Sequence, residues 1–156
     1  MAILFLDSSA LVKHYVPEAG SAWVQAMTDP KTDNRLYVAR ITGVEVVAAI
    51  TRRQRRGDIT PNDAGIVLAA FRRDFPAAFA VVETTSVVIA RAMDLAEQHG
   101  LRGYDAVQLA AALTLYDQCR ALGFPAPLVI SADEELNAAA LAEGLTADNP
   151  NSHPYL

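Results

Sequence analysis

Four acidic side chains stand at or near the beginning of an expected helix: Asp7, Glu45, Asp105 and Asp133. A set of oxygen ligands without histidine or cysteine favours Mg²⁺ or Mn²⁺ over Zn²⁺. Carboxylates that share one place repel each other, and they shift toward protonation unless a cation neutralises them. If the fold gathers these four side chains, the pattern predicts a metal site able to hydrolyse a phosphodiester without a protein nucleophile.

Strand ends are expected to gather most of these acids. Asp7 and Asp133 each follow a short apolar run without polar alternation, which is typical of a strand buried on both faces of a parallel sheet. Glu45 follows another such run after one short connector. The carboxyl ends of parallel strands meet at one edge, where open α/β sheets bind ligands. Asp105 follows no strand, so this rule does not place it.

Each acid also has a purely structural explanation. Asp7 or Asp133 could cap the helix that follows it by accepting a backbone N–H bond. Glu45 completes a capping-box pattern that begins at Thr42. Asp105 could simply favour the positive end of a helix dipole. The functional interpretation therefore depends on all four acids together.

Strand and helix patterns alternate along the whole chain, which predicts a three-layer α/β/α fold around a central, mostly parallel sheet of four or five strands. Strands are expected at residues 2–6, 36–39, 79–82, 128–130 and, as a short last strand, 145–147. Helices are expected at 9–16, 21–27, 42–54, 60–75, 85–99, 104–122 and from 134 to the stop at Gly144. Pro76 is expected to end the fourth helix. We expect one domain over residues 1–148 and a polar tail over 149–156.

Composition narrows the class of protein. A chain of 156 residues with 52% hydrophobic and 20% charged residues fits one folded domain. No apolar run approaches the roughly 20 residues of a membrane helix. No signal peptide is recognisable and Cys119 is the only cysteine, so we expect the cytoplasm as its compartment. The sequence has no G-x-x-x-x-G-K or G-x-G-x-x-G pattern, which argues against nucleotide triphosphate and dinucleotide cofactors.

Charge is unevenly distributed, although the net charge is only −5. Residues 31–73 hold nine of the thirteen basic residues, whereas residues 94–156 hold nine acids and two arginines. One surface could therefore meet phosphates while another carries an acidic site. The alternative is a pair of solvated, arginine-rich helix ends. The candidate phosphate-binding residues are Arg52, Arg53, Arg55, Arg56, Arg72 and Arg73.

Four segments resemble the motifs of one family. They are LDSSALVK at 6–13, RITGVEV at 40–46, GYDAVQLA at 103–110 and SADEEL at 131–136. In order and spacing they resemble PIN-domain ribonucleases, and among them the VapC-like toxins of bacterial toxin–antitoxin pairs. Gly43 departs from this pattern, since a bulkier or polar residue is common there.

The resemblance implies a metal-dependent endoribonuclease in which Asp7, Glu45, Asp105 and Asp133 bind Mg²⁺ or Mn²⁺ and Ser9 supports them. It also implies a PIN fold, a homodimer, a structured RNA substrate and a cognate antitoxin. The arginine clusters would then hold the RNA backbone, with a strong salt dependence, or an acidic segment of the antitoxin.

Two other functions remain open on the sequence. Asp7 could be the nucleophile of a phosphatase or phosphotransfer domain. Haloacid-dehalogenase-like enzymes, however, carry a second aspartate two residues later, where this chain has Ser9. The other alternative is a non-catalytic PIN-like module that binds RNA or protein.

Overall fold

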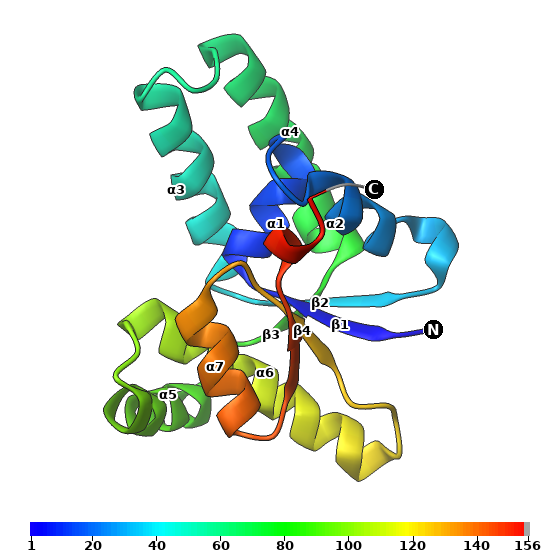
Figure 1. Cartoon of the computed structure of the whole chain (residues 1–156), viewed down its shortest axis with the longest axis vertical. Helices are drawn as coiled ribbons and strands as arrows, with labels where there is room; N and C mark the ends of the chain where they lie inside the picture. The colour runs from blue at the N-terminus through cyan, green and yellow to red at the C-terminus, as the bar shows by residue number, and fades with distance from the viewer. Residues whose placement is uncertain (155–156) are drawn as a thin grey trace.

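A five-stranded, entirely parallel sheet forms the middle of the molecule (Figure 1). The structure, a computed structural model, describes residues 1–154. All five expected strands are confirmed, and their order across the sheet is β3-β2-β1-β4-β5. The strand order reverses between β1 and β4, which is the place where open α/β sheets form a ligand crevice. The strands are β1 Ile3–Leu6, β2 Arg35–Ala39, β3 Ala80–Val82, β4 Leu128–Ile130 and β5 Thr146–Asp148.

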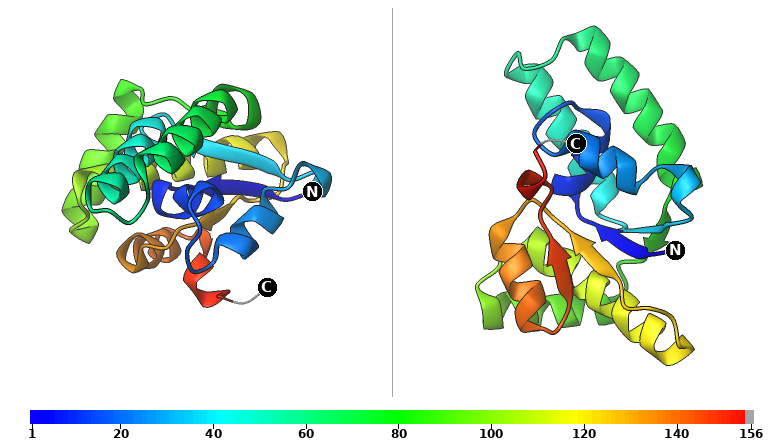
Figure 2. Two further views of the ribbon diagram at one scale, coloured as in Figure 1. Left: turned by 90° about the horizontal axis from the view of Figure 1, so that it is seen from above. Right: turned by 45° about the vertical axis from the view of Figure 1, so that its right-hand side comes forward.

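Helices cover both faces of the sheet, so the three-layer prediction is confirmed (Figure 2). On one face lie α1 Ser8–Tyr15, α2 Ser21–Met27, α3 Thr42–Arg55 and α4 Pro61–Ala78. On the other lie α5 Ser86–His99, α6 Gly103–Leu122 and α7 Glu134–Ala142. Two short 3₁₀ turns, η1 Pro30–Thr32 and η2 Pro150–Ser152, complete the elements.

The central strand β1 is buried on both faces. Ile3 and Phe5 pack into the core beneath α5, α6 and α7, whereas Leu4 and Leu6 pack into the core beneath α1, α3 and α4. This two-sided burial explains why the strand has no polar alternation. It also holds the residue that follows β1 in one position.

The hairpin of α3 and α4 extends away from the sheet (Figures 1 and 2). The prediction that Pro76 ends α4 is wrong, because the helix continues to Ala78. Proline removes only one helical N–H bond, and Pro76 lies in the exposed last turn, where water can satisfy the freed carbonyl group. As a result, β3 begins one residue later than expected.

The end of the described chain packs against α2. Gly20 has a φ of +83°, and a Cβ there would lie 2.4 Å from the carbonyl oxygen of Pro150. The rings of Trp23 and His153 stack with centroids 4.3 Å apart. The domain boundary at residue 148 stays a prediction, and residues 155 and 156 of the expected tail lie outside the described residues. No helix within residues 1–154 is both long enough and apolar enough to cross a membrane.

Candidate functional site

Asp7 lies at the carboxyl end of β1 and is only 2% exposed. Its backbone N–H donates to the carbonyl of Ile130 in the neighbouring strand at 3.1 Å. Its Oδ1 accepts bonds from Ser9 Oγ at 2.7 Å and from the Ala10 N–H at 3.1 Å, and its Oδ2 accepts one from Ser131 Oγ at 2.9 Å. Asp7 therefore caps α1, as the structural explanation proposed, and its carboxylate has one fixed orientation.

Burial raises the pKa of Asp7 to about 7, although the bonds from Ser9, Ala10 and Ser131 oppose the rise. The negative charge of Glu45 raises it further. Near neutral pH a proton therefore competes for this carboxylate. A bound cation would remove that competition by stabilising the ionised form.

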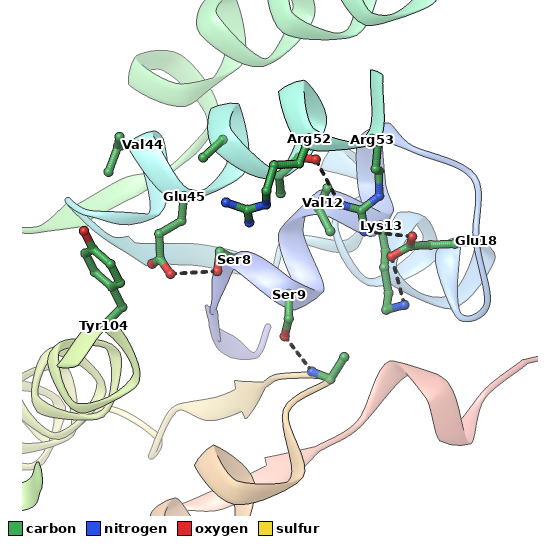
Figure 3. A pocket seen from close by; sticks show the side chains of 13 residues that line it. Ser8, Ser9, Val12, Lys13, Glu18, Val44, Glu45, Arg52, Arg53 and Tyr104 are labelled. Carbon is green, nitrogen blue, oxygen red and sulfur yellow. Dashed lines mark hydrogen bonds and ion pairs between the residues drawn. The ribbon is translucent and has the colours of Figure 1, made fainter. Parts of the chain in front are cut away.

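Glu45 lies in the first turn of α3, and its carboxylate points toward Ser8 at the start of α1 (Figure 3). Ser8 Oγ donates to its Oε2 at 3.2 Å, and Gln108 Nε2 donates to its Oε1 at 2.7 Å. The alternative capping box does not form, because Ile41 and not Thr42 is the N-cap of α3, and the Glu45 carboxylate binds Ser8 and Gln108 instead. Burial raises the pKa of Glu45, and the charge of Asp105 adds to this effect.

Asp105 and Asp133 extend the acidic edge toward α6 and α7. Asp133 caps α7 by accepting a bond from the Leu136 N–H at 2.9 Å. Asp105, which the strand-end rule did not place, lies in the first turn of α6. Burial raises its pKa, and the next largest cause is repulsion from Asp133. The structure thus connects all four predicted acids through the charges they exert on one another.

Three polar residues that the sequence reasoning missed position these acids. Ser131 donates to Asp7 and accepts a bond from the Asp133 N–H at 3.0 Å, so one hydroxyl joins two of the acids. Ser8 and Gln108 hold Glu45. All three lie inside the recognised motifs. The residue type alone does not predict their role, because a serine or glutamine can bind many partners and the fold determines which one is near. Ser9, which was predicted, contacts Asp7 and also accepts a bond from the Ala132 N–H at 2.9 Å.

A cleft of about 510 Å³ opens beside Glu45, between α1, α3 and the start of α6 (Figure 3). Polar groups of Ser8, Ser9 and Glu45 line it on the side of the acidic edge. The remaining lining residues are Val12, Lys13, Glu18, Val44, Ala48, Ala49, Arg52, Arg53, Tyr104 and Ala132.

Two of the six candidate arginines, Arg52 and Arg53, line this cleft. Arg53 is bound to Glu18 at 3.0 Å, whereas Arg52 has no ion-pair partner within the part of the chain that the structure describes. The charge of Arg52 lowers the pKa of Glu45 and so opposes its burial. The other four arginines are exposed outside the cleft: Arg55, Arg56, Arg72 and Arg73. Two of them form ion pairs with near neighbours in the sequence, Arg56 with Asp58 and Arg73 with Asp74.

The donor set fits a hydrated divalent cation. Within residues 1–154, no three acidic, histidine or cysteine side chains converge closely enough to bind one ion directly. Mg²⁺ usually keeps several waters and contacts only one or two carboxylates. Asp7, Glu45 and Asp105 have raised pKa values, and a cation held near one or two of them would relieve the repulsion between their charges.

Comparison with known proteins assigns the family. The PIN domain family matches residues 4–141. Ribonuclease VapC45 from Mycobacterium tuberculosis is 37% identical over 147 residues, which covers 92% of this chain and 93% of that protein.

Two solved structures share the fold. PAE2754 from Pyrobaculum aerophilum has a TM-score of 0.62 at 20% identity, and the match covers 94% of this chain and 83% of that one. A toxin–antitoxin complex from Klebsiella pneumoniae has a TM-score of 0.59 at 13% identity, with 94% and 97% covered. The match to the PIN domain family and the identity to VapC45 show that this chain belongs to the PIN-domain family, in its VapC-like group.

Proposed function

We propose that this chain is a metal-dependent endoribonuclease and the toxin of a toxin–antitoxin pair. The observation that carries the proposal is the row of four acids that begins at Asp7, which is buried and hydrogen-bonded. The charge of each further acid acts on the one before it in this row: Glu45 on Asp7, Asp105 on Glu45 and Asp133 on Asp105. The relative VapC45 is named a ribonuclease, which supports RNA as the substrate. A structural neighbour comes from a toxin–antitoxin complex, which supports an antitoxin as the partner.

Asp7, Glu45, Asp105 and Asp133 would hold Mg²⁺ or Mn²⁺. Such an ion supplies charge stabilisation at the phosphate and makes water a better nucleophile at neutral pH. Ser9 and Ser131 keep Asp7 oriented, and Ser8 and Gln108 do the same for Glu45. These bonds favour the ionised carboxylates, because each of them lowers the pKa that burial raises.

The alternative in which Asp7 attacks phosphorus itself has less support. Asp7 is 2% exposed, and both of its oxygens accept hydrogen bonds. A carboxylate nucleophile must approach the phosphorus atom in line with the leaving oxygen, and a buried side chain has no room for this approach. A small ion needs much less space beside the same oxygens.

The arginines divide by position. Arg52 reaches over the cleft next to Glu45, so we infer that it contacts a phosphate of the RNA (Figure 3). Arg53 is held at the cleft wall by Glu18. Arg55, Arg56, Arg72 and Arg73 face solvent, where they are available to the RNA backbone or to an acidic segment of the antitoxin. A homodimer and a cytoplasmic location also stay predictions from the resemblance.

Incubation of the purified chain with total RNA tests the proposal. We expect cleavage with Mg²⁺ or Mn²⁺, no cleavage in EDTA, and recovery when the metal is returned. Asp105→Asn should abolish cleavage, whereas Asp117→Asn, an exposed acid farther along the same helix, should not. Cleavage that persists in EDTA would contradict metal dependence. The absence of cleavage of any RNA would favour the binding module.

A further inference from the structure

Tyr104 is a large aromatic side chain left open to solvent at the mouth of the cleft. It is 64% exposed, and so is Val44, which lines the same cleft. Tyr104 lies in the first turn of α6, directly before Asp105, so its backbone position is fixed by the same helix that carries one of the acids. Single exposed apolar residues are ordinary, but Tyr104 and Val44 both line the cleft, and exposed apolar surface at a groove points to ligand binding.

The cleft arranges three kinds of side chain in sequence. Figure 3 shows Tyr104 on one side, Arg52 on the other, and Glu45 between them. A nucleotide carries a flat apolar base joined to an anionic phosphate. The ring of Tyr104 is suited to the base and the cation of Arg52 to the phosphate. A nucleotide bound in this way has its phosphodiester bond near Glu45 and the acidic edge.

The ion pairs of the basic residues in the cleft indicate where a phosphate of the nucleotide would bind. Lys13 donates to Glu18 at 3.1 Å, and Arg53 binds the other oxygen of Glu18 at 3.0 Å. Both positive charges at that end of the cleft are therefore already shared with one carboxylate. Arg52 is the cleft cation that has no ion-pair partner among residues 1–154, so it is the one able to take a phosphate.

We propose that Tyr104 is the platform on which a nucleobase of the RNA stacks while Arg52 holds an adjoining phosphate. This inference rests on the proposed function and adds a specificity-determining residue to it. Aromatic rings bind bases of single-stranded nucleic acids in a sequence-tolerant way. In a duplex both faces of a base are covered by its neighbours, so the cleft would select an unpaired nucleotide.

Binding of a short single-stranded RNA that contains 2-aminopurine tests the stacking, because this base loses fluorescence when it stacks on an aromatic ring. The full chain is used in EDTA and, in a second arm, as the Asp7→Asn variant with Mg²⁺, so that no cleavage interferes. We expect fluorescence quenching with Tyr104→Phe and Tyr104→Trp as with the natural residue. Tyr104→Ala should lose the quenching and bind about 5- to 150-fold more weakly.

The matched control is Phe124→Ala, which removes an exposed aromatic ring beyond the opposite end of α6. It should leave both quenching and affinity unchanged. The same RNA in a fully paired duplex should bind more weakly to the natural chain, and Tyr104→Ala should reduce this difference.

Unchanged quenching and affinity in Tyr104→Ala would overturn the inference and leave the ring for contact with a protein partner. A loss of quenching in Tyr104→Phe would overturn it as well, since it would assign the effect to the hydroxyl group. Failure of the proposed function has a different signature: RNA binds and 2-aminopurine is quenched, but no RNA is cut with Mg²⁺ or Mn²⁺.

Discussion

The acidic edge and the arginine-bearing α3–α4 hairpin are built in opposite ways. The acids are buried or half-buried, and their partners are distant in the sequence: Ser131 reaches Asp7 across 124 positions, and Gln108 reaches Glu45 across 63. The two hairpin arginines that form ion pairs outside the cleft do so with near neighbours in the sequence, Arg56 with Asp58 and Arg73 with Asp74. The position of the acids is therefore a property of the whole fold, whereas that of these outer arginines is local.

The two regions also differ in energetic cost. Burial raises the pKa of Asp7, Glu45 and Asp105, so the folded chain holds charges that water would stabilise better. The hairpin arginines keep their water, and exposed ion pairs contribute only about 0–1 kcal/mol. We therefore expect substitutions at the acidic edge to change activity and stability strongly, and substitutions on the hairpin to change mainly the salt dependence of RNA binding.

The largest effect is expected for Asp7→Asn. It keeps the shape of the side chain but removes the charge, so RNA cleavage should fall by more than about 100-fold. Initial rates with saturating Mn²⁺ measure this, and circular dichroism checks that the variant is folded. Asp117→Asn, exposed on α6, should cut RNA at the natural rate. Equal cleavage rates in the natural chain, Asp7→Asn and Asp117→Asn would mean that the charge of Asp7 is not needed for cleavage.

Ser131→Ala should have the next largest effect. The hydroxyl group donates to the carboxylate of Asp7 and accepts from the backbone N–H of Asp133, so its loss frees one oxygen of Asp7 and leaves that N–H without its partner. We expect cleavage to fall about 10- to 100-fold, as for other residues that orient metal ligands. Part of the loss should be recovered at high Mn²⁺ concentration. Ser86→Ala, at the exposed start of α5, is the control. A loss of activity that no metal concentration relieves would assign Ser131 another role.

The same contrast explains what the sequence could predict. The strands were predictable because two-sided burial leaves an uninterrupted apolar run, and the place of Asp7 and Asp133 near the strand ends was predictable because they follow such runs. Asp105 needed the family resemblance, since no strand precedes it. Ser131 and Gln108 were not recognised because their role depends on partners brought near by folding. The high density of arginines between residues 52 and 73 was evident from the sequence. That Arg52 lines the cleft while Arg72 does not follows from the packing of α3 against α1, which the sequence did not predict.

The pH dependence of stability should distinguish Asp7 from the arginines. Its pKa is about 7 in the folded chain, well above that of an unfolded aspartate. A raised pKa means that the folded state binds the proton more tightly, so this stability is complete at low pH and is lost as the pH rises from about 4 through 7.

Asparagine does not titrate, so the Asp7→Asn variant lacks this pH dependence. In EDTA, its unfolding free energy relative to the natural chain should therefore increase between pH 5 and pH 8, by an amount on the order of 3 kcal/mol at most. Urea unfolding at several pH values measures it. Arg72→Gln should show no trend, and a constant difference for Asp7→Asn would mean that Asp7 is ionised at all these pH values.

Arg52→Gln should leave stability within about 0.5 kcal/mol, as is usual at the surface, but should weaken RNA binding. If Arg52 contacts one phosphate, the negative slope of log affinity against log salt should become shallower by about 0.7 for a single-stranded RNA. Arg120→Gln, exposed near the far end of α6, is the matched control and should keep the slope. An unchanged slope in Arg52→Gln would place the phosphate elsewhere, for example along the hairpin.

The smallest effect is expected at Gly43, where the hairpin meets the acidic edge. A Cβ at this position would lie 3.1 Å from Cζ and 3.3 Å from Cε1 of Phe75 on α4. This close approach explains the departure from the family pattern, since a bulkier residue needs the ring to move. Replacing glycine with alanine inside a helix gains about 1 kcal/mol, and we expect displacement of the half-buried ring to offset most of it.

Gly43→Ala should therefore be nearly neutral in the natural chain and should stabilise a Phe75→Leu variant by about 1 kcal/mol, because leucine lacks the two atoms in contact. Urea unfolding of the two single variants and the double variant gives this interaction energy. Cleavage should stay unchanged in Gly43→Ala, since Ser8 and Gln108 hold Glu45 independently of α4. A drop in cleavage without a loss of stability would mean that α4 controls the position of Glu45, so that the hairpin and the acidic edge act as one unit.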